Sequence, residues 1–370
     1  MANLYFDNAA TSFPKPPAVA AEITRYLNDV GGPYGRGAYA QALSVSRVVE
    51  ECRDVLASKL GIASSQQLVF THNATHAINM VLHGMNLHNK QVLISPLEHN
   101  AVMRPLAACG ACYTVLPSQS DGLIDIDKTA QLLDADTALI IVNHQSNING
   151  VIQPVAALKK AAGNVPVLVD AAQSAGHEQI LCDEWEVDFL AVTGHKGLLG
   201  PTGTGALFIR DQKRLQLTVQ GGTGSNSELF TMPQNMPDRF ESGTPNIAGI
   251  FGLLGALQST IEPRHSRAQF SAFLDDLKNM ACYRVFCAAN PARQGMLVSV
   301  AHPVKSSSQI ARDLSEHYGI ALRSGLHCAP LGHRHLKTFP HGTVRISCSP
   351  YHTAADLQVL RDALYRIGTT

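Results

Sequence analysis

The 370-residue chain has no excess of charge of either sign, because 29 Lys and Arg residues balance 29 Asp and Glu residues. A basic surface for nucleic acid or for an anionic membrane is therefore not indicated. No apolar run approaches the roughly 18 residues that a membrane-spanning helix requires. The first residues lack the basic and apolar regions of a signal peptide. We therefore expect a cytoplasmic protein with neither nucleic-acid nor membrane partners.

The eight cysteines lack the spacing of a disulfide framework or a zinc site. Cys109 and Cys112 form a Cys-x-x-Cys pair, but no second pair with matching spacing would complete a metal site. His333 and His335 follow Cys328 closely without the spacing of tetrahedral ligands. We therefore expect reduced thiols and no bound metal.

Short apolar segments alternate with helical patterns between residues 67 and 209. Candidate strands lie at residues 67–70, 91–94, 112–116, 138–142, 165–169, 187–192 and 205–209. This alternation predicts an α/β fold whose mostly parallel sheet is covered by helices on both faces. After residue 247 the pattern changes to an α+β style. We predict a large domain at 15–246 and a small α+β domain at 247–370, with residues 1–14 able to pack on it.

Polar residues follow five of the predicted strands directly. These clusters are Thr71–Thr75, Ser95–His99, Asn143–Asn147, Asp170–Gln173 and Thr193–Lys196. In open α/β sheets, ligands bind beyond the carboxyl ends of the strands. If the strands are parallel, the five clusters meet at one edge of the sheet and form a ligand site.

The chemistry of these clusters suits pyridoxal 5′-phosphate (PLP). A partly desolvated amine at Lys196 can form a Schiff base with an aldehyde. Asp170 could hold the pyridine nitrogen protonated, which makes PLP an electron sink. Ala74 and Thr75 open a helix whose free N–H groups suit a phosphate.

Five further residues could complete the PLP site. Thr193 and His195 could bind the phosphate, and His99 could lie flat on the ring. Gln173 and Asn147 could hydrogen-bond the phenolic oxygen of the ring. Each residue alone is weak support, since a lysine after a strand is usually a surface residue and an aspartate there often caps a helix. Their occurrence together at successive strand ends predicts a PLP enzyme with the cofactor on Lys196.

These residues resemble the class V aminotransferase family of fold-type I PLP enzymes. Within it, the sequence is most similar to cysteine desulfurases and selenocysteine lyases with an Arg-x-Gly-x-His-Cys-Ala motif, which here spans residues 323–329. Other matching stretches lie at 5–11, 98–100, 169–173, 193–196 and 239–244. The resemblance implies a PLP-dependent cysteine desulfurase that converts L-cysteine to L-alanine, usually as a homodimer with its active site at the interface.

The resemblance also implies individual catalytic roles. Lys196 would carry PLP and move protons at the substrate α-carbon, while His99 would stack on the ring and take part in proton transfer. Cys328 would attack the substrate sulfur and leave as a persulfide. Arg323 and His327 would favour the thiolate if their side chains turn toward Cys328. Arg345 would hold the substrate carboxylate in a two-pronged geometry, with Arg323 as a second substrate-binding residue.

The remaining implied roles concern binding of the cofactor. Asp170 would pair with the pyridinium, and Gln173 would contact the phenolic oxygen. Thr75, Thr193 and His195 would bind the phosphate, together with Thr244 of the partner subunit. Asn147 would lie near cofactor and substrate. The Gly-rich loop at 221–246 fits an approach to a neighbouring subunit.

Several alternatives stay open from the sequence. A selenocysteine lyase would share every motif, and transamination or β-elimination would leave Cys328 a bystander or a buried small hydrophobe. A non-catalytic scaffold is disfavoured because Lys196 and Asp170 are both present. The chain departs from the family at His76, where Glu is usual after the threonine, and at His352, where Asn is common. Substrate preference and the sulfur acceptor, a protein or a thiol, therefore remain open.

Overall fold

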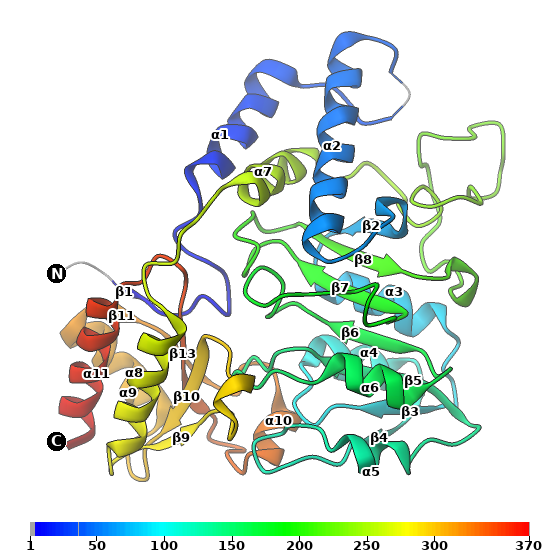
Figure 1. The fold of residues 1–370 in the computed structure, drawn as a ribbon. Helices are drawn as coiled ribbons and strands as arrows, with labels where there is room; N and C mark the ends of the chain where they lie inside the picture. The colour runs from blue at the N-terminus through cyan, green and yellow to red at the C-terminus, as the bar shows by residue number, and fades with distance from the viewer. Residues whose placement is uncertain (1–3, 36, 370) are drawn as a thin grey trace.

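The computed structural model describes residues 4–35 and 37–369 of the chain. Its largest sheet has seven strands among these residues, in the order β2-β8-β7-β6-β5-β3-β4 (Figure 1). The strands are β2 (Leu68–Thr71), β3 (Gln91–Ile94), β4 (Cys112–Val115), β5 (Thr137–Asn143), β6 (Val167–Asp170), β7 (Phe189–Thr193) and β8 (Gly205–Ile209). β3 to β7 run parallel, whereas β8 is antiparallel to both β2 and β7. The predicted α/β fold with a mostly parallel sheet is confirmed.

Helices cover both faces of this sheet, which explains why its strands read as continuous apolar runs. Leu190 and Val192 of β7 pack in the same core as α2 (Ala40–Lys59), α6 (Val155–Ala162) and α7 (Ile247–Gln258). Phe189 and Ala191 face the opposite core, formed with α3 (Ala74–Gly84) and α4 (Asn100–Ala108). α5 (Ile126–Ala130) and α6 lie on the same side. Both faces of every central strand are thus withdrawn from water.

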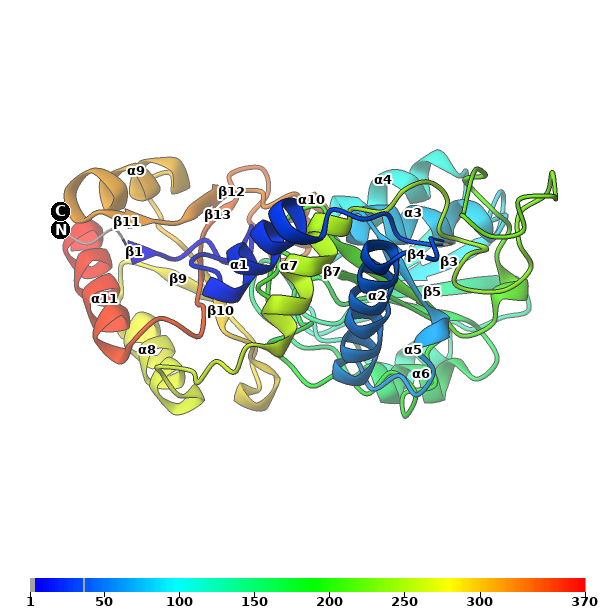
Figure 2. The same ribbon diagram turned by 90° about the horizontal axis from the view of Figure 1, so that it is seen from above.

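A second, four-stranded antiparallel sheet of order β12-β13-β10-β9 lies beside the first (Figure 2). Its strands are β9 (Arg284–Phe286), β10 (Leu297–Ala301), β12 (Arg323–Gly325) and β13 (Thr343–Ser347). The core of this unit also takes in residues from α8 (Arg267–Asn279), α9 (Ser307–Tyr318) and α11 (Ala354–Thr369), whereas α10 (Pro330–His335) lies toward the large sheet. β1 (Leu4–Tyr5) pairs with β11 (Ile320–Ala321), and Phe6 is buried in this smaller core. The N-terminal segment therefore packs on the C-terminal unit.

α7 bears on where the two units divide. Its Ile250, Phe251 and Leu254 are buried in the core of the seven-stranded sheet, and the helix packs against α1 (Pro17–Arg25) and α2. The division at residue 247 stays a prediction, and these contacts favour a division after α7 instead. α7 is almost wholly apolar but has only 12 residues. In the described ranges, no helix combines the length and the apolar character needed to cross a membrane.

Candidate functional site

A cavity lies at the carboxyl ends of β5, β6 and β7, next to the start of α3. Its lining comprises Asn73, Ala74, Thr75, His99, Ala101, Asn143, Gln145, Asn147, Asp170, Ala172, Gln173, Thr193, His195 and Lys196. Because β3, β5, β6 and β7 are parallel, the polar residues that follow them converge on one edge. Every residue predicted to bind the cofactor lines this cavity except Thr244.

Lys196 lies in the turn that follows β7, and this turn is firmly anchored. Leu199 N–H donates to the Lys196 carbonyl at 2.8 Å, and Ser12 N–H of the N-terminal segment donates to the His195 carbonyl at 2.9 Å. Burial lowers the pKa of Lys196 to about 8; Asp170 opposes this shift, and the positive charges of Arg345 and Arg323 add to it. About a tenth of this amine is therefore neutral, and nucleophilic, at pH 7.

Asp170 ends β6 and is 6% exposed. Its Oδ1 accepts a hydrogen bond from Ala172 N–H at 2.9 Å, and burial raises the pKa of its carboxyl group while Lys196 lowers it. Gln173, one turn further on, donates from Nε2 to the Ala9 carbonyl at 2.9 Å. The N-terminal segment thus fixes Gln173 at the cavity, a contact that the sequence did not indicate.

The first turn of α3 offers N–H groups to the cavity. Asn73 caps the helix by accepting a hydrogen bond from His76 N–H at 2.9 Å, which leaves the N–H groups of Ala74 and Thr75 at the helix start. His195 lies across from this turn, and its Nδ1 is buried without a hydrogen-bond partner among the described residues. A helix start next to an unpaired imidazole nitrogen suits an anionic group.

His99 caps the start of α4 with its own side chain. Its Nδ1 accepts a hydrogen bond from Ala101 N–H at 3.0 Å, so the ring proton is assigned to Nε2. Burial, followed by the charge of Lys196, lowers the pKa of His99 to about 4. The imidazole is therefore neutral at neutral pH and offers an N–H donor from Nε2.

Cys328 lies on a sharp turn after β12. Gly325, His327 and Cys328 have φ angles of 101°, 47° and 56°, which are left-handed conformations that only glycine adopts without strain. The thiol is exposed, and Arg323 donates to its sulfur with an N···S distance of 3.6 Å. Asn100 N–H donates to the Cys328 carbonyl at 2.7 Å. The turn is thereby tied to the start of α4, next to His99.

His327 does not support the thiol, contrary to the expectation that it could turn toward it. Its Nε2 lies 3.1 Å from both the carbonyl and the hydroxyl oxygen of Thr343, and its carbonyl accepts from Asn147 Nδ2 at 2.8 Å. Burial lowers the pKa of His327 to about 2. His327 is a neutral structural residue of the turn, and Arg323 supplies the positive charge beside the sulfur.

Arg345 is buried in β13 at 1% exposure and bound on two sides. Its guanidinium pairs with Asp7 Oδ1 at 2.8 Å and donates to the Asn147 carbonyl at 3.1 Å. The Nε atom has no partner among the described residues. The sequence did not indicate Asp7 as a site residue, although it lies in the family-like stretch 5–11. A carboxylate that binds Arg345 must therefore share the guanidinium with Asp7 or displace it.

Thr244 is exposed and lies outside the cavity in the single chain. The loop that carries it is held by Glu241, which pairs with the buried Arg53 of α2 at 2.5 Å and accepts from Phe70 N–H at 2.6 Å. The structure of one chain thus leaves the predicted phosphate contact of Thr244 untested.

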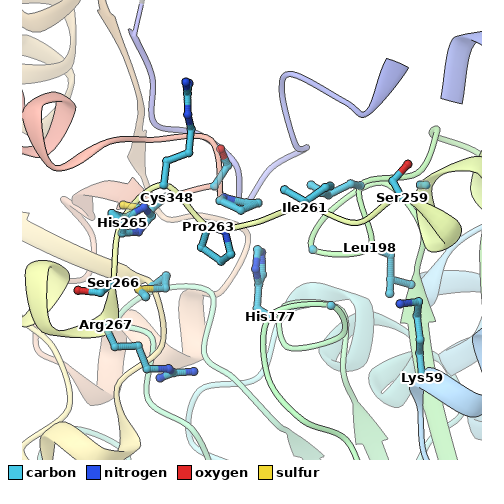
Figure 3. A pocket seen from close by; sticks show the side chains of 18 of the residues that line it. Lys59, His177, Leu198, Ser259, Ile261, Pro263, His265, Ser266, Arg267 and Cys348 are labelled. Carbon is cyan, nitrogen blue, oxygen red and sulfur yellow. The ribbon is translucent and has the colours of Figure 1, made fainter. Parts of the chain in front are cut away.

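A larger cavity of about 760 Å³ lies between the two units, behind the Lys196 turn. Figure 3 shows His177 at its centre, with Leu198 and Lys59 on one side and His265 and Cys348 on the other. None of the predicted site residues lines it. In residues 4–35 and 37–369, no group of three or more His, Cys, Asp or Glu side chains is arranged to hold a metal. The smaller cavity is therefore the candidate site.

Comparison with known proteins is consistent with this geometry. The family model of class-V aminotransferases matches residues 4–360. The chain belongs to the class-V aminotransferase family. A probable cysteine desulfurase of Methanothermobacter thermautotrophicus is 32% identical to this member over a 386-position alignment that covers 99% of this chain and 95% of that protein.

Solved structures of relatives share the whole fold. The apo structure of a cysteine desulfurase from Thermococcus onnurineus NA1 matches with a TM-score of 0.90 at 27% identity, covering 99% of this chain and 94% of that one. The S-sulfonic acid form of the cysteine desulfurase CsdA from Escherichia coli matches with a TM-score of 0.86 at 28% identity, covering 98% and 94%. The fold is therefore that of fold-type I PLP enzymes.

Members of the class-V aminotransferase family depend on PLP, and the residues of the cavity fit this cofactor. A partly neutral amine at Lys196 suits its aldehyde, and a buried carboxyl at Asp170 suits its ring nitrogen. The start of α3 and the unpaired Nδ1 of His195 suit its phosphate, and the unpaired Oδ1 of Asn147 provides a further polar contact. Within residues 4–35 and 37–369, His195 Nδ1 and Asn147 Oδ1 are buried without a partner, and a polar ligand in the cavity would supply one.

Proposed function

We propose that this chain is a cysteine desulfurase that transfers sulfur from L-cysteine to Cys328 and releases L-alanine. The observation that carries the proposal is the exposed Cys328 thiol, which contacts Arg323 and is tied through Asn100 to the edge of the Lys196 cavity. The named relatives act on the same substrate class. A thiol with no catalytic task would more commonly be buried as a small apolar side chain.

The cavity residues would divide the binding of PLP among them. Lys196 would hold the aldehyde carbon, Asp170 the ring nitrogen and His99 the ring face. The phosphate would lie against Ala74, Thr75, Thr193 and His195, and the phenolic oxygen against Gln173 and Asn147. When bound, PLP withdraws electrons from the substrate α-carbon and so acidifies its hydrogen.

The other residues would orient the substrate and move protons. Arg345 would hold the substrate carboxylate by a charge-assisted, two-pronged contact, with Asp7 giving way. The Lys196 amine would take and return the proton at the α-carbon, for which a pKa of about 8 is well matched. His99 would present its Nε2 proton to the reacting groups, because its Nδ1 is engaged by Ala101 N–H.

Sulfur transfer would be a displacement at the substrate sulfur. The Cys328 thiolate would form a bond to this sulfur while the carbon–sulfur bond breaks. The electron pair of the broken bond stays with the carbon part, which becomes alanine after protonation. Cys328 ends as a persulfide, and a thiol of an acceptor molecule then takes the terminal sulfur. Arg323 would stabilise the negative charge on sulfur before attack.

We further propose that two copies form a homodimer through the loop at 221–246. Three large apolar side chains on or beside this loop are exposed in the single chain: Val219 at 54%, Leu229 at 52% and Phe230 at 110%. A second copy that packs on this loop would bury this apolar surface. In such a dimer Thr244 of one chain could reach the phosphate of the other. A molar mass measured by light scattering tests this: twice the 39.7 kDa of one chain supports the dimer, and a fully active monomer excludes it.

Alanine release from L-cysteine in the presence of a reductant tests the function. We expect alanine and sulfide in equal amounts from the wild type and neither from Cys328→Ala. Cys112→Ala is the matched control, because Cys112 is also exposed but lies on β4, away from the cavity. Activity on selenocysteine with none on cysteine would contradict the proposed substrate.

A further inference from the structure

Glu98, the residue before His99, is fully buried and lies between two strand ends. Its Oε1 is 2.6 Å from the Ser95 hydroxyl, which follows β3, and accepts a hydrogen bond from Asn143 N–H at the end of β5 at 2.8 Å. The Ser95 hydroxyl is also 3.0 Å from Asn143 Oδ1. Within the described part of the chain, Glu98 Oε2 has no partner. Glu98 thus joins β3, β5 and the turn that presents His99.

With an ionised Glu98, this cluster has too few hydrogens for its short oxygen–oxygen contacts. The Ser95 hydroxyl has one proton but faces two acceptor oxygens, Glu98 Oε1 and Asn143 Oδ1. Asn143 cannot be turned to supply a proton, because its Nδ2 already donates to the Leu97 carbonyl at 2.7 Å. With an ionised carboxylate, one of the two short oxygen–oxygen contacts would therefore hold no proton.

A proton on Glu98 Oε1 supplies a hydrogen to both oxygen–oxygen contacts. Glu98 then donates to Ser95, Ser95 donates to Asn143 Oδ1, and Oε1 still accepts from Asn143 N–H. The charge environment agrees: Asp170, on the neighbouring β6, is the charged group that raises the pKa of Glu98 further after burial, which brings it to about 8. The contacts from β3 and β5 come from the neutral Ser95 and Asn143. An ionised Glu98 would be repelled by Asp170, which favours the neutral form of Glu98.

We propose that Glu98 is a positioning residue that works as a neutral carboxylic acid, whose proton links the ends of β3 and β5 and sets the turn of His99. The link to the reaction rests on the proposed function, whereas the protonation state does not. A neutral Glu98 would leave Asp170 as the carboxylate that this part of the sheet edge offers to the ring nitrogen of PLP.

Infrared difference spectroscopy of the PLP-loaded protein at pH 6.5 tests the protonation state directly. Wild type minus Glu98→Gln should show the carbonyl stretch of a carboxylic acid, which lies above the amide bands. Glu228→Gln is the matched control, because Glu228 is exposed and its difference spectrum should lack the band of a buried carboxylic acid. Ionised bands for Glu98 as well would overturn the proposal.

The pH dependence of unfolding gives a second readout. Burial raises the pKa of Glu98 above its ordinary value of 4.5, so folding binds a proton and stability falls as pH rises from about 4.5 to about 8. The unfolding constant of the wild type relative to Glu98→Gln should rise by up to about tenfold per pH unit in this range. A ratio that does not change with pH would contradict a neutral Glu98.

Kinetics then separate positioning from a merely structural role. Glu98→Gln keeps a neutral group, but one amide atom at the position of Oε1 cannot both donate to Ser95 and accept from Asn143 N–H. We therefore expect a fall in kcat smaller than that of Glu98→Ala, with the pH titration of cofactor absorbance as in the wild type. Glu98→Ala should lower kcat at least about tenfold, the effect of one lost buried hydrogen bond. Loss of cofactor titration in Glu98→Gln would contradict the proposal. A wild type that releases no alanine would refute only the desulfurase, because the infrared result still decides the state of Glu98.

Discussion

The Lys196 cavity and the Cys328 turn differ in almost every physical respect. Lys196, Asp170 and Asn147 follow buried parallel strands, and burial lowers the pKa of the Lys196 amine to about 8 and raises that of the Asp170 carboxyl group. Cys328 is exposed on a turn of left-handed residues at the edge of the smaller sheet. In the proposed function the cofactor chemistry would have a desolvated site, and the sulfur chemistry would have one that another molecule can reach. An enzyme that passes sulfur to an acceptor needs both properties.

Removing the Lys196 amine from the buried cavity should give the largest loss of activity. We expect Lys196→Ala to lower the rate of alanine release by on the order of a thousandfold or more, because the general base at the α-carbon is lost. The variant should also lose its cofactor more readily on gel filtration, which absorbance measures. Lys160→Ala, on the outer helix α6, is the control. Retained activity in Lys196→Ala would remove this lysine from the mechanism.

The two-pronged contact at Arg345 should give the next largest effect. Lysine keeps the charge but cannot hold two carboxylate oxygens at once or maintain the contact with Asp7 and Asn147. We expect Arg345→Lys to lower kcat/KM for cysteine by about a hundredfold, from the loss of about 2–3 kcal/mol of charged hydrogen bonding. Cofactor absorbance should be unchanged. An equal loss of bound PLP would instead indicate a structural role.

The pKa of Lys196 predicts how the capture of PLP depends on pH. Because burial lowers the pKa of this amine to about 8, its neutral fraction should rise about tenfold per pH unit below that value and level off above it. The rate at which PLP absorbance changes on binding to cofactor-free protein should follow this curve. His99, with a pKa of about 4, should add no inflection near neutrality. A rate that keeps rising up to pH 10 would contradict a desolvated lysine.

We expect a smaller effect at the exposed Cys328 turn. Arg323→Met keeps the length and apolar stem of the side chain but removes the charge beside the Cys328 sulfur. We expect alkylation of Cys328 by iodoacetamide to slow by about tenfold, the effect of one charge-assisted contact of ~1.4 kcal/mol. Mass spectrometry of the labelled peptide measures it, with Cys112 as internal reference. Unchanged labelling would show that Arg323 does not act on the thiol.

Most of the buried site follows from local sequence. A polar residue directly after an apolar strand must lie at the sheet edge, so nine of the ten predicted cofactor residues line one cavity. The antiparallel direction of β8 could not be predicted, because periodicity carries no information on strand direction.

Contacts between residues distant in sequence could not be foreseen. Asp7 and Arg345 are 338 positions apart and meet only because the N-terminal segment packs on the smaller sheet. The orientation of His327 toward Thr343 depends on side-chain packing, which a motif does not encode. The proton shared by Glu98 and Ser95 depends on hydrogen-bond geometry at two strand ends. Sequence therefore predicts which residues gather, and the structure adds how they are paired.

The most direct test compares alanine release from L-cysteine by the wild type and by Cys328→Ala, with the absorbance of bound PLP recorded for both. We predict the same absorbance in both proteins, with alanine and sulfide produced by the wild type alone. Equal alanine release by the variant would contradict it, because sulfur would then leave without the thiol that the Cys328 turn presents.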